Sequence, residues 1–283
     1  MDNNTVNSIS DVLDATYLIN LDSDIQRLQE FDRVMKLGSW NYERFPAVNG
    51  KKLLGSWENV VGEEEYNKLR ELLILKKKYV GNVHFLSKSE IGCLLSHVML
   101  WEKVATDPKL NRIAIFEDDA RTHVEASTVF QLLTDLYSYL QQQNIEEPDM
   151  LYLGKALDDC MSYEKVWGNV YRSKHPLCLH AYIMTKKGAQ KLLKLAPYNL
   201  AIDLVPIRAT EAGVINIMAF HPSIYFQDVF GTTSNLRKLE GAINHTSECL
   251  VTMQHVSSST WQYSVFVVIA ILAAIMLFIL YYR

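Results

Sequence analysis

The stretch ATYLINLDSDIQRLQEFDRVMKLG, residues 15–38, decides the fold class. Its first eight residues are an apolar run that ends in Asn and Asp, which is too short for a helix and predicts a buried strand. Apolar residues then recur at helical spacing, and Gly38 supplies a C-terminal stop. NYERFPAVNG, residues 41–50, follows as a second short strand that ends in an Asn-Gly turn. The order strand, helix, strand predicts an α/β fold with a mainly parallel sheet.

The chain continues to alternate helices and strands up to residue 236. The longest helix is predicted in SKSEIGCLLSHVMLWEKVA, where Ser87 and Glu90 have capping-box spacing. Other helices are predicted near residues 63–77, 128–142 and 186–197. Strands are predicted at residues 113–116, 149–154, 179–185, 213–220 and 223–228. We therefore expect one domain over residues 15–236, preceded by a polar tail at residues 1–14.

The composition argues against a nucleic-acid partner. The 283 residues include 28 Lys and Arg against 32 Asp and Glu, which gives a net charge of −4. Binding to a phosphate backbone needs clustered Lys and Arg, but the densest basic run, residues 76–78, is accompanied by an acidic run at residues 63–65. Both runs are interpreted as solvated faces. With 49% apolar residues, the chain can bury a sizeable core.

The four cysteines, Cys93, Cys160, Cys178 and Cys249, are far apart and form no C-x-x-C pair. Neither a disulfide framework nor a zinc ribbon is therefore expected. Cys93 and Cys178 lie in apolar surroundings and are predicted to be reduced core residues, which fits a reducing compartment.

The C-terminus has the pattern of a membrane span. VFVVIAILAAIMLFIL, residues 265–280, has no polar side chain, and aromatic residues border it on both sides. The 22 residues from Trp261 to Tyr282 can cross a hydrocarbon core of roughly 30 Å at about 1.5 Å per residue. We expect a transmembrane helix over residues 261–283, joined to the domain by a polar linker at residues 237–260. The alternative is a buried core helix.

The N-terminal sequence MDNNTVNSISDVLD does not resemble a secretory signal peptide. The span is therefore predicted to be a tail anchor that leaves the domain facing the cytosol. Two N-x-T glycosylation acceptors, Asn3 and Asn244, would matter only if the domain were lumenal.

The stretch IAIFEDDA, residues 113–120, is the main candidate for chemistry, because four apolar residues run into three carboxylates. Strand side chains alternate, so Glu117 and Asp119 are predicted on one face and Asp118 on the other. Ligands of open α/β sheets bind at the carboxyl ends of strands. Two carboxylates two residues apart can share a hard cation such as Mg²⁺ or Mn²⁺. The alternative is an acidic surface turn.

Six segments occur in a defined order: YLINLD with a following Arg, RFPAVNG, SEIGCLLSHVMLWEKV, IAIFEDDA, YLG and HAYIMTKKGAQKLL. This series, from Thr16 to Asp228, resembles glycosyltransferase family 25, which includes bacterial lipooligosaccharide galactosyltransferases and animal procollagen galactosyltransferases. The E-I-G-C-x-x-S-H helix followed by a strand and E-D-D is the most specific part. The family usually has Asp where this chain has Asn49.

The resemblance implies a GT-A-like, Rossmann-like domain that binds a UDP-sugar donor together with Mn²⁺ or Mg²⁺. By position, Glu117 is expected near the ribose or the sugar of the donor. Asp119 is expected to hold the cation against the diphosphate, with Asp118 assisting, so Glu117 and Asp119 are the predicted metal ligands. A cation at this point neutralises the charge that develops on the leaving diphosphate.

Other donor-binding residues are implied by the same match: Asn20, Leu21, Asp22, Arg27, Asn49, Ser96, His97 and His180. Arg27 is expected to contact phosphate, because a guanidinium forks onto anions. The alternative for Arg27 is the solvent face of a helix, and the alternative for His97 is a core histidine with satisfied hydrogen bonds.

The resemblance also implies transfer with inversion of the anomeric centre, which needs a general base on the acceptor hydroxyl. Asp203 in LAIDLVP is the expected base, and Asp228 in YFQDVF is the second candidate. The alternative for Asp203 is a helix N-cap.

These observations predict a membrane-anchored galactosyl- or glucosyltransferase that acts on a glycan or protein hydroxyl. The alternative is a non-catalytic relative that keeps nucleotide-sugar binding as a binding or scaffolding module. A metal-dependent phosphotransferase or hydrolase would need a motif such as D-x-D-x-T or a P-loop, and the sequence has neither.

Overall fold

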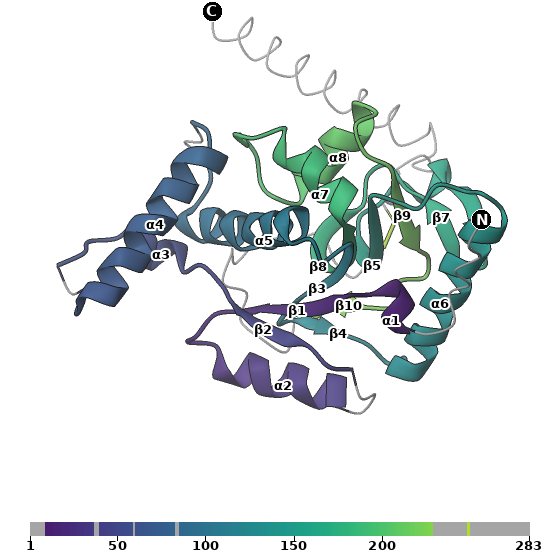
Figure 1. Cartoon of the computed structure of the whole chain (residues 1–283), viewed down its shortest axis with the longest axis horizontal. Coiled ribbons are helices and arrows are strands. Elements are labelled where there is room, and N and C mark those ends of the chain that lie inside the picture. The colour runs from purple at the N-terminus through teal and green to yellow at the C-terminus, as the bar shows by residue number, and fades with distance from the viewer. Residues whose placement is uncertain (1–8, 37–39, 59, 83–84, 229–247, 250–283) are drawn as a thin grey trace, which may run out of the picture. The chain divides into compact units, whose positions relative to one another are not determined.

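The fold is organised around one mixed sheet (Figure 1). The computed structural model describes residues 9–36, 40–58, 60–82, 85–228 and 248–249. Within these residues eight strands form a sheet in the order β2-β1-β3-β8-β5-β9-β7-β6. Their bounds are Ala15–Asn20 (β1), Glu43–Pro46 (β2), Arg112–Glu117 (β3), Met150–Ala156 (β5), Glu164–Trp167 (β6), Val170–Arg172 (β7), Leu177–Thr185 (β8) and Ile217–Phe220 (β9). A separate two-stranded ladder pairs β4 (Ala120–Arg121) with β10 (Phe226–Gln227).

Most strands of this sheet run in the same direction. β1 pairs in parallel with β2 and with β3, and β5 pairs in parallel with β9. β8 lies between β3 and β5 and is antiparallel to both, so β3 and β5 share one direction. At the far edge, β7 is antiparallel to β9 and β6 is antiparallel to β7. Only β7 and β8 therefore oppose the other described strands of the sheet, and the predicted α/β fold with a mainly parallel sheet is confirmed.

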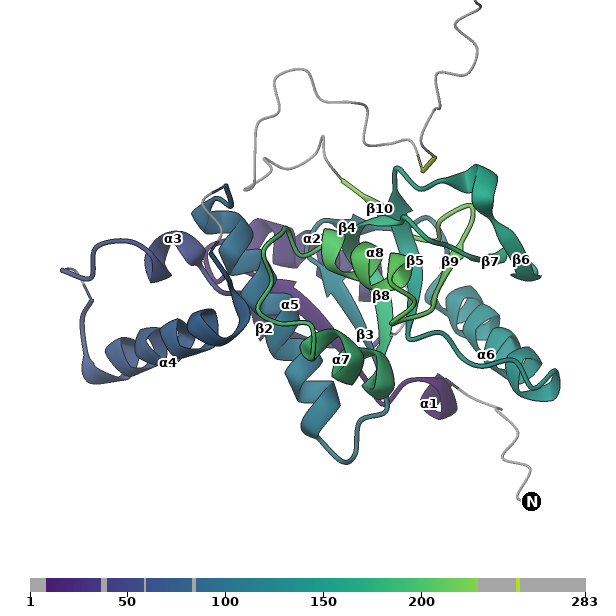
Figure 2. The same cartoon turned by 90° about the horizontal axis from the view of Figure 1, so that it is seen from above.

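Helices cover both faces of the sheet (Figures 1 and 2). On one face, the buried core includes side chains from α4 (Glu63–Tyr79), α5 (Lys88–Thr106), α7 (Lys186–Leu193) and α8 (Leu204–Glu211). The core on the other face includes side chains from α1 (Ile9–Val12), α2 (Ile25–Lys36) and α6 (Ala126–Gln142). Along β3, Ile113 and Ile115 belong to the first core, whereas Ala114 and Phe116 belong to the second. This alternation is why a short, wholly apolar run forms a strand buried on both faces.

The structure differs from the sequence-based expectations in three local features. The Asn-Gly pair at residues 49–50 does not form a turn but begins α3 (Gly50–Leu53), with the Asn49 side chain accepting a hydrogen bond from the Lys52 amide at 3.0 Å. The antiparallel hairpin of β6 and β7 was not predicted, because these strands are only four and three residues long and mostly lack buried side chains. Part of the predicted N-terminal tail is also ordered, since Val12 of α1 is buried.

Helix α5 begins as its sequence predicts. Ser87 and Glu90 form both hydrogen bonds of a capping box, at 3.2 and 2.7 Å. The helix packs so closely against α3 that a Cβ atom on Gly92 would lie 2.4 Å from the Val48 carbonyl oxygen and 2.7 Å from the Gly50 nitrogen. The glycines of the AVNG and EIGC segments therefore allow two backbones to touch.

The predicted transmembrane helix, residues 261–283, lies outside the described residues. Most of the predicted linker, residues 237–260, also lies outside them. Among the helices that the structure describes, none has the length and apolarity needed to cross a membrane. The span and its orientation therefore stay predictions.

The cysteines differ from the expectation in one respect. Cys160 and Cys249 form a disulfide across a sequence separation of 89 residues, whereas Cys93 and Cys178 are free, as predicted. The bond places Glu248 and Cys249, two residues of the predicted linker, against the domain. Spacing alone could not reveal it, because the tertiary structure is what brings these two distant cysteines within bonding distance.

Candidate donor-binding site

The carboxyl ends of β1 and β3 meet at one pocket. Because these strands are parallel and Ile19 pairs with Glu117, the residues that follow each strand lie side by side. The pocket has a volume of about 220 Å³. Its lining comes from the end of β1 and the start of α2, the loop after β2, helix α5, the end of β3, and Gln227. Predicted site residues in this lining are Asn20, Leu21, Arg27, Asn49, Ser96, Glu117, Asp118 and Asp119.

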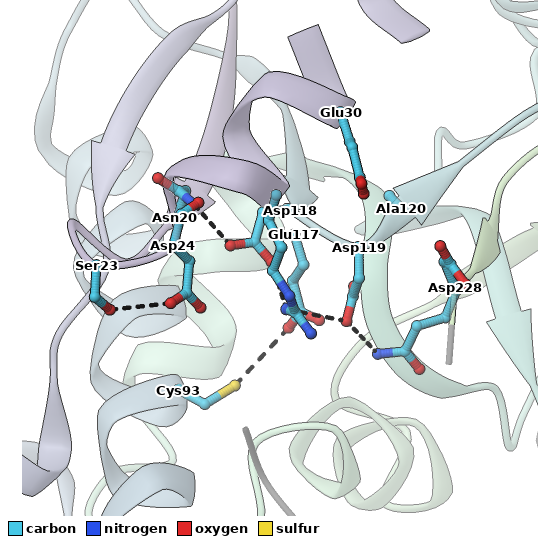
Figure 3. A network of polar contacts seen from close by, with 12 residues as sticks. Asn20, Ser23, Asp24, Glu30, Cys93, Glu117, Asp118, Asp119, Ala120 and Asp228 are labelled. Atoms are coloured by element: carbon cyan, nitrogen blue, oxygen red, sulfur yellow. Dashed lines mark hydrogen bonds and ion pairs between the residues drawn. The ribbon is translucent and has the colours of Figure 1, made fainter. Parts of the chain in front are cut away.

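All three acids of the E-D-D segment line this pocket, which corrects the predicted separation of Asp118 from its neighbours. Strand alternation holds only as far as Glu117, where β3 ends, and Asp118 and Asp119 lie in the turn before β4. Figure 3 shows the acids converging from this turn, with Asn20 on one side and Asp228 on the other. The predicted pairing of Glu117 with Asp119 is therefore part of a larger acidic cluster.

Asp118 is held by two donors from the first β-α unit. The Asn20 amide donates to Asp118 Oδ2 at 2.8 Å, and the Arg27 guanidinium donates to Oδ1 at 2.7 Å. Burial raises the pKa of Asp118, and the Arg27 charge acts in the opposite direction. The Arg27 side chain is 12% exposed, so the alternative of a solvent-facing arginine is wrong. Its guanidinium also lies 3.6 Å from Asp119 Oδ2 and thus spans both aspartates.

Of the three acids, Asp119 is in the environment that most disfavours a charged carboxylate. Burial, together with the charges of Glu117 and Asp118, raises its pKa to about 7. Its Oδ2 accepts from the Gln227 amide at 3.2 Å, but its buried Oδ1 has no hydrogen-bond partner among the described residues. A buried carboxylate oxygen without a donor is costly unless a cation or water fills the position.

Glu117 has the opposite environment. Its Oε1 lies 2.9 Å from His97 Nε2 and 3.8 Å from the Cys93 thiol. Burial raises the pKa of Glu117, but the hydrogen bond with His97 and the positive charge of Arg27 act against it, and the pKa lies below its ordinary value. One acid of the cluster is thus kept ionised while its neighbour Asp119 is easily protonated.

Ser96 and Asn49 shape the pocket wall through the backbone. The Ser96 hydroxyl accepts from the Val48 amide and donates to the Gly92 carbonyl, both at 2.8 Å. This ties the loop after β2 to helix α5. Asn49 caps α3 and retains the acceptor role that an Asp would have at this position.

Three predicted donor-binding residues do not line the pocket. The Asp22 side chain is 72% exposed and pairs with Arg44 at 2.6 Å. His97 is fully buried behind Glu117, so its predicted role as a direct contact is replaced by a role through that acid. His180 is also buried, with Nε2 3.3 Å from the Tyr225 carbonyl and Nδ1 unpaired among the described residues; burial lowers its pKa.

The two candidate bases approach the cluster from different elements. Asp203 is the N-cap residue of α8, as the alternative interpretation predicted. Its side chain, however, makes no capping hydrogen bond. Burial raises the Asp203 pKa, and the charge of Glu117 raises it further. Asp228 follows β10, and its backbone amide donates to the Asp119 carbonyl at 2.9 Å. Neither acid lines the pocket itself.

Sequence reasoning missed several pocket residues. Gln227 contacts Asp119, and Cys93 lies beside Glu117. Only weak sequence signals pointed to these two residues. Cys93 is four residues before His97 and so lies on the same helix face, and Gln227 directly precedes the candidate base Asp228. Other lining residues that had not been predicted are Ser23, Asp24, Lys51 and Ser89.

A second polar cluster lies at the carboxyl end of β5. The ammonium of Lys155 is fully buried, 3.6 Å from Glu248 and 3.9 Å from Asp158, and makes no hydrogen bond among the described residues. Burial lowers its pKa. Glu248 also accepts from the Ser223 amide and lies 2.9 Å from His221 Nδ1. The disulfide at Cys249 thus fixes a carboxylate over a buried cation.

Most of this chain is similar in sequence to known proteins. Residues 13–205 match the family described as "Glycosyltransferase family 25 (LPS biosynthesis protein)". The procollagen galactosyltransferase 1-A of Xenopus laevis is 29% identical over 198 residues, which are 69% of this chain and 30% of that protein. A Bos taurus protein named "probable inactive glycosyltransferase 25 family member 3" is 31% identical over 114 residues, 40% of this chain and 18% of that protein.

The shared region has limits. The chain spans about a third or less of the length of the curated relatives it matches. Among solved structures, a UDP-glucose pyrophosphorylase complexed with UDP-glucose covers 73% of this chain and 89% of its own, with 13% identity and a TM-score of 0.35. That likeness is too low to bear on function. The family match instead covers most of the described domain, including the E-D-D pocket, and the chain belongs to glycosyltransferase family 25.

Proposed function

We propose that this chain is a glycosyltransferase that transfers a hexose, galactose or glucose, from a UDP-sugar to a hydroxyl of a glycan or protein. Family membership supports the reaction class, and the Xenopus relative named as a procollagen galactosyltransferase supports galactose as one donor sugar. The observation that carries the proposal is the pocket itself. It brings the ends of β1 and β3 together around three acids and Arg27.

The residues present fit a divalent cation, Mn²⁺ or Mg²⁺. Asp119 supplies a buried oxygen without a donor, and its pKa is raised to about 7 by burial and by neighbouring carboxylates, so a cation would relieve both costs. Glu117 and Asp119 would hold it, with Asp118 close by. When bound, the cation would neutralise the diphosphate as the glycosidic bond breaks.

The chain's own residues account for the other requirements of the reaction. Arg27 would pair with the donor phosphates while it offsets the charge of the aspartates. For inversion, the acceptor oxygen attacks the anomeric carbon opposite the leaving UDP, and a base takes the acceptor proton. We favour Asp203, because burial and the charge of Glu117 raise its pKa, which suits a carboxylate that must take up a proton. Asp228 is the second candidate.

The membrane anchor at residues 261–283 is retained as part of the proposal and rests on the apolar run at residues 265–280. A cytosolic orientation of the domain is one of two candidates. The disulfide between Cys160 and Cys249 favours instead an oxidising compartment for the domain. Protease protection of the full chain in intact microsomes distinguishes the two orientations.

Activity with the full-length chain in detergent tests the function. UDP release from UDP-galactose and UDP-glucose should require Mn²⁺ or Mg²⁺, and Asp119→Asn should reduce it at least about 100-fold. Asp135→Asn, an exposed aspartate of α6, is the matched control and should act as the wild type. Normal turnover by the Asp119→Asn protein would show that the metal assignment is wrong.

A non-catalytic binding module is the second candidate, favoured by the relative from Bos taurus whose name includes the word inactive. Such a protein would still be stabilised by UDP with Mn²⁺ in a thermal-shift assay. It would release no UDP from either sugar nucleotide. The two measurements together decide between an enzyme and a binding protein.

A further inference from the structure

Helix α5 carries a polar stripe on a buried face. Cys93, His97 and Trp101 are spaced four residues apart, so their side chains lie on one side of the helix. Most neighbouring residues on this side are apolar and buried. Two of the three side chains reach polar groups of the sheet in hydrogen bonds under 3 Å. The stripe therefore has a role beyond filling the core.

The contacts form a continuous chain of hydrogen bonds. Trp101 Nε1 donates to the Tyr182 hydroxyl at 2.9 Å. The same hydroxyl lies 2.9 Å from His97 Nδ1, and His97 Nε2 lies 2.9 Å from Glu117 Oε1. Trp101, Tyr182 and His97 are all fully buried, so a donor left without a partner among them would be costly.

The number of protons fixes the direction of each bond. An indole N–H only donates, so Tyr182 accepts from Trp101 and has one proton of its own to give. If His97 carried a proton on Nδ1, the Tyr182 hydroxyl would accept twice and its own proton would have no partner among the described residues. With the proton on Nε2 instead, Tyr182 donates to Nδ1 and His97 donates to Glu117. Only this arrangement satisfies every donor while it leaves Glu117 ionised.

We propose that His97 is a neutral positioning residue, protonated at Nε2 and oriented by Tyr182 and Trp101, which fixes Glu117 for the pocket. The donated hydrogen bond occupies Glu117 Oε1 and leaves the second carboxylate oxygen for whatever the pocket binds. That Glu117 faces a cation or a nucleotide sugar rests on the proposed function. The orientation of His97 itself rests only on the hydrogen bonds.

His97 could either donate a hydrogen bond to Glu117 or bind a metal ion together with it, and the proposed tautomer allows only the first. Cys93, His97 and Glu117 offer ligand atoms within 4.8 Å of one another, a spacing that would suit a metal ion. A protonated Nε2 has no lone pair to give to a metal. A cation is therefore expected at Glu117 and Asp119, not at His97.

Nitrogen NMR of the full-length wild-type chain tests the tautomer without any ligand. The His97 signals are assigned by their loss in His97→Gln. The expected spectrum at neutral pH has a directly bonded proton on Nε2 and none on Nδ1. A proton on Nδ1 alone, or on both nitrogens, overturns the proposal.

Two substitutions then test the positioning role. The side-chain amide introduced by His97→Gln reaches the place of Nε2 and can still donate to Glu117, whereas the shorter amide introduced by His97→Asn reaches only the place of Nδ1. UDP affinity in Mn²⁺, measured by calorimetry, should fall about tenfold in His97→Asn and less than about threefold in His97→Gln. Melting temperatures check that both variants are folded. Equal affinities overturn the positioning role.

The outcomes separate this inference from the proposed function. If the wild-type chain binds no UDP with Mn²⁺, the proposed function fails, and the nitrogen spectrum still decides the state of His97. If the wild type binds but His97→Asn binds as well as His97→Gln, the proposed function stands and the positioning role fails.

Discussion

Arg27 and Asp118 form an ion pair of 2.7 Å that joins two segments 91 residues apart. One partner belongs to the first helix after β1, and the other follows β3. The same guanidinium lies 3.6 Å from Asp119, so one cation serves two of the three clustered acids. The pair therefore both connects the first β-α unit to the sheet and restrains repulsion in the pocket.

Arg27→Gln should destabilise the domain in the absence of divalent cations. Breaking a buried ion pair leaves a carboxylate without its compensating charge. We expect a loss of about 3 kcal/mol in the free energy of unfolding. This value is at the lower end for such pairs because the site is partly open to solvent. Urea denaturation at pH 8 in EDTA measures it. Arg33→Gln, an exposed position of the same helix, is the control. Saturating Mn²⁺ should recover part of the loss, and equal stability of the two variants would contradict the role of Arg27.

Asp119 should make stability depend on pH in a defined direction. Its pKa rises from an ordinary 3.8 to about 7 on folding, because of burial and the neighbouring carboxylates. Between these values the folded chain keeps a proton that the unfolded chain has released, so the free energy of unfolding falls as pH rises and levels off above 7. At about 1.4 kcal/mol per pKa unit, the fall from pH 5 to pH 8 is up to about 2.7 kcal/mol.

Asp119→Asn removes this titration and is the informative comparison. Relative to the wild type, the variant should gain stability between pH 5 and pH 8 by the same amount, measured by urea denaturation in EDTA. Mn²⁺ should stabilise the wild type more at pH 8 than at pH 5, because Asp119 must lose its proton to bind a cation. A constant difference between the two proteins across this range would refute the raised pKa.

The strands and helices around the pocket were predictable because each carries its own local signal. The apolar run of β1, the helical spacing in α2 and the capping box of α5 each specify an element from a few adjacent residues. The position of the acids followed from the same logic, since ligands lie beyond the carboxyl ends of parallel strands. Glu117 is an example, whereas Arg27, which also lines the pocket, was expected only from the family resemblance.

The features that sequence could not supply depend on where the chain leaves regular structure. Alternation predicted Asp118 on the wrong side, because β3 ends one residue earlier and a turn reorients the side chain. His97 was ambiguous until Tyr182, 85 residues away, supplied its partner. The disulfide of Cys160 with Cys249 likewise depends on the meeting of distant segments. Such contacts are set by tertiary packing and not by local pattern.

Gly92→Ala should disturb both stability and the pocket. Its new Cβ would lie 2.4 Å from the Val48 carbonyl oxygen, so α5 and the loop after β2 must move apart. Overpacking of this kind costs about 1–3 kcal/mol in the free energy of unfolding. Because the same loop lines the pocket, UDP affinity in Mn²⁺ should fall as well. Lys88→Ala, exposed on the same helix, is the control and should change neither quantity; an unchanged affinity in Gly92→Ala would show that the loop does not shape the site.

Cys249→Ser should destabilise the oxidised protein through two effects. The disulfide closes a loop with a sequence separation of 89, and losing a cross-link of that length costs roughly 4.5 kcal/mol in the chain-entropy account. It also frees Glu248 to leave Lys155, whose buried ammonium would then keep Asp158, at 3.9 Å, as its one carboxylate partner among the described residues. Urea denaturation of the oxidised proteins measures the combined loss in the free energy of unfolding.

Reduction separates the disulfide from any general effect of losing a thiol. A reducing agent should lower the stability of the wild type toward that of Cys249→Ser and leave the variant itself unchanged. Cys178→Ala, which removes a free cysteine, should keep the full response to reduction.

A shortened chain ending at residue 236 lacks Glu248 and Cys249 altogether, so it should be no more stable than the reduced protein. If reduction leaves the wild type unaffected, the segment at residues 248–249 does not hold the end of β5, and Lys155 is stabilised without it by Asp158 and the Tyr163 ring.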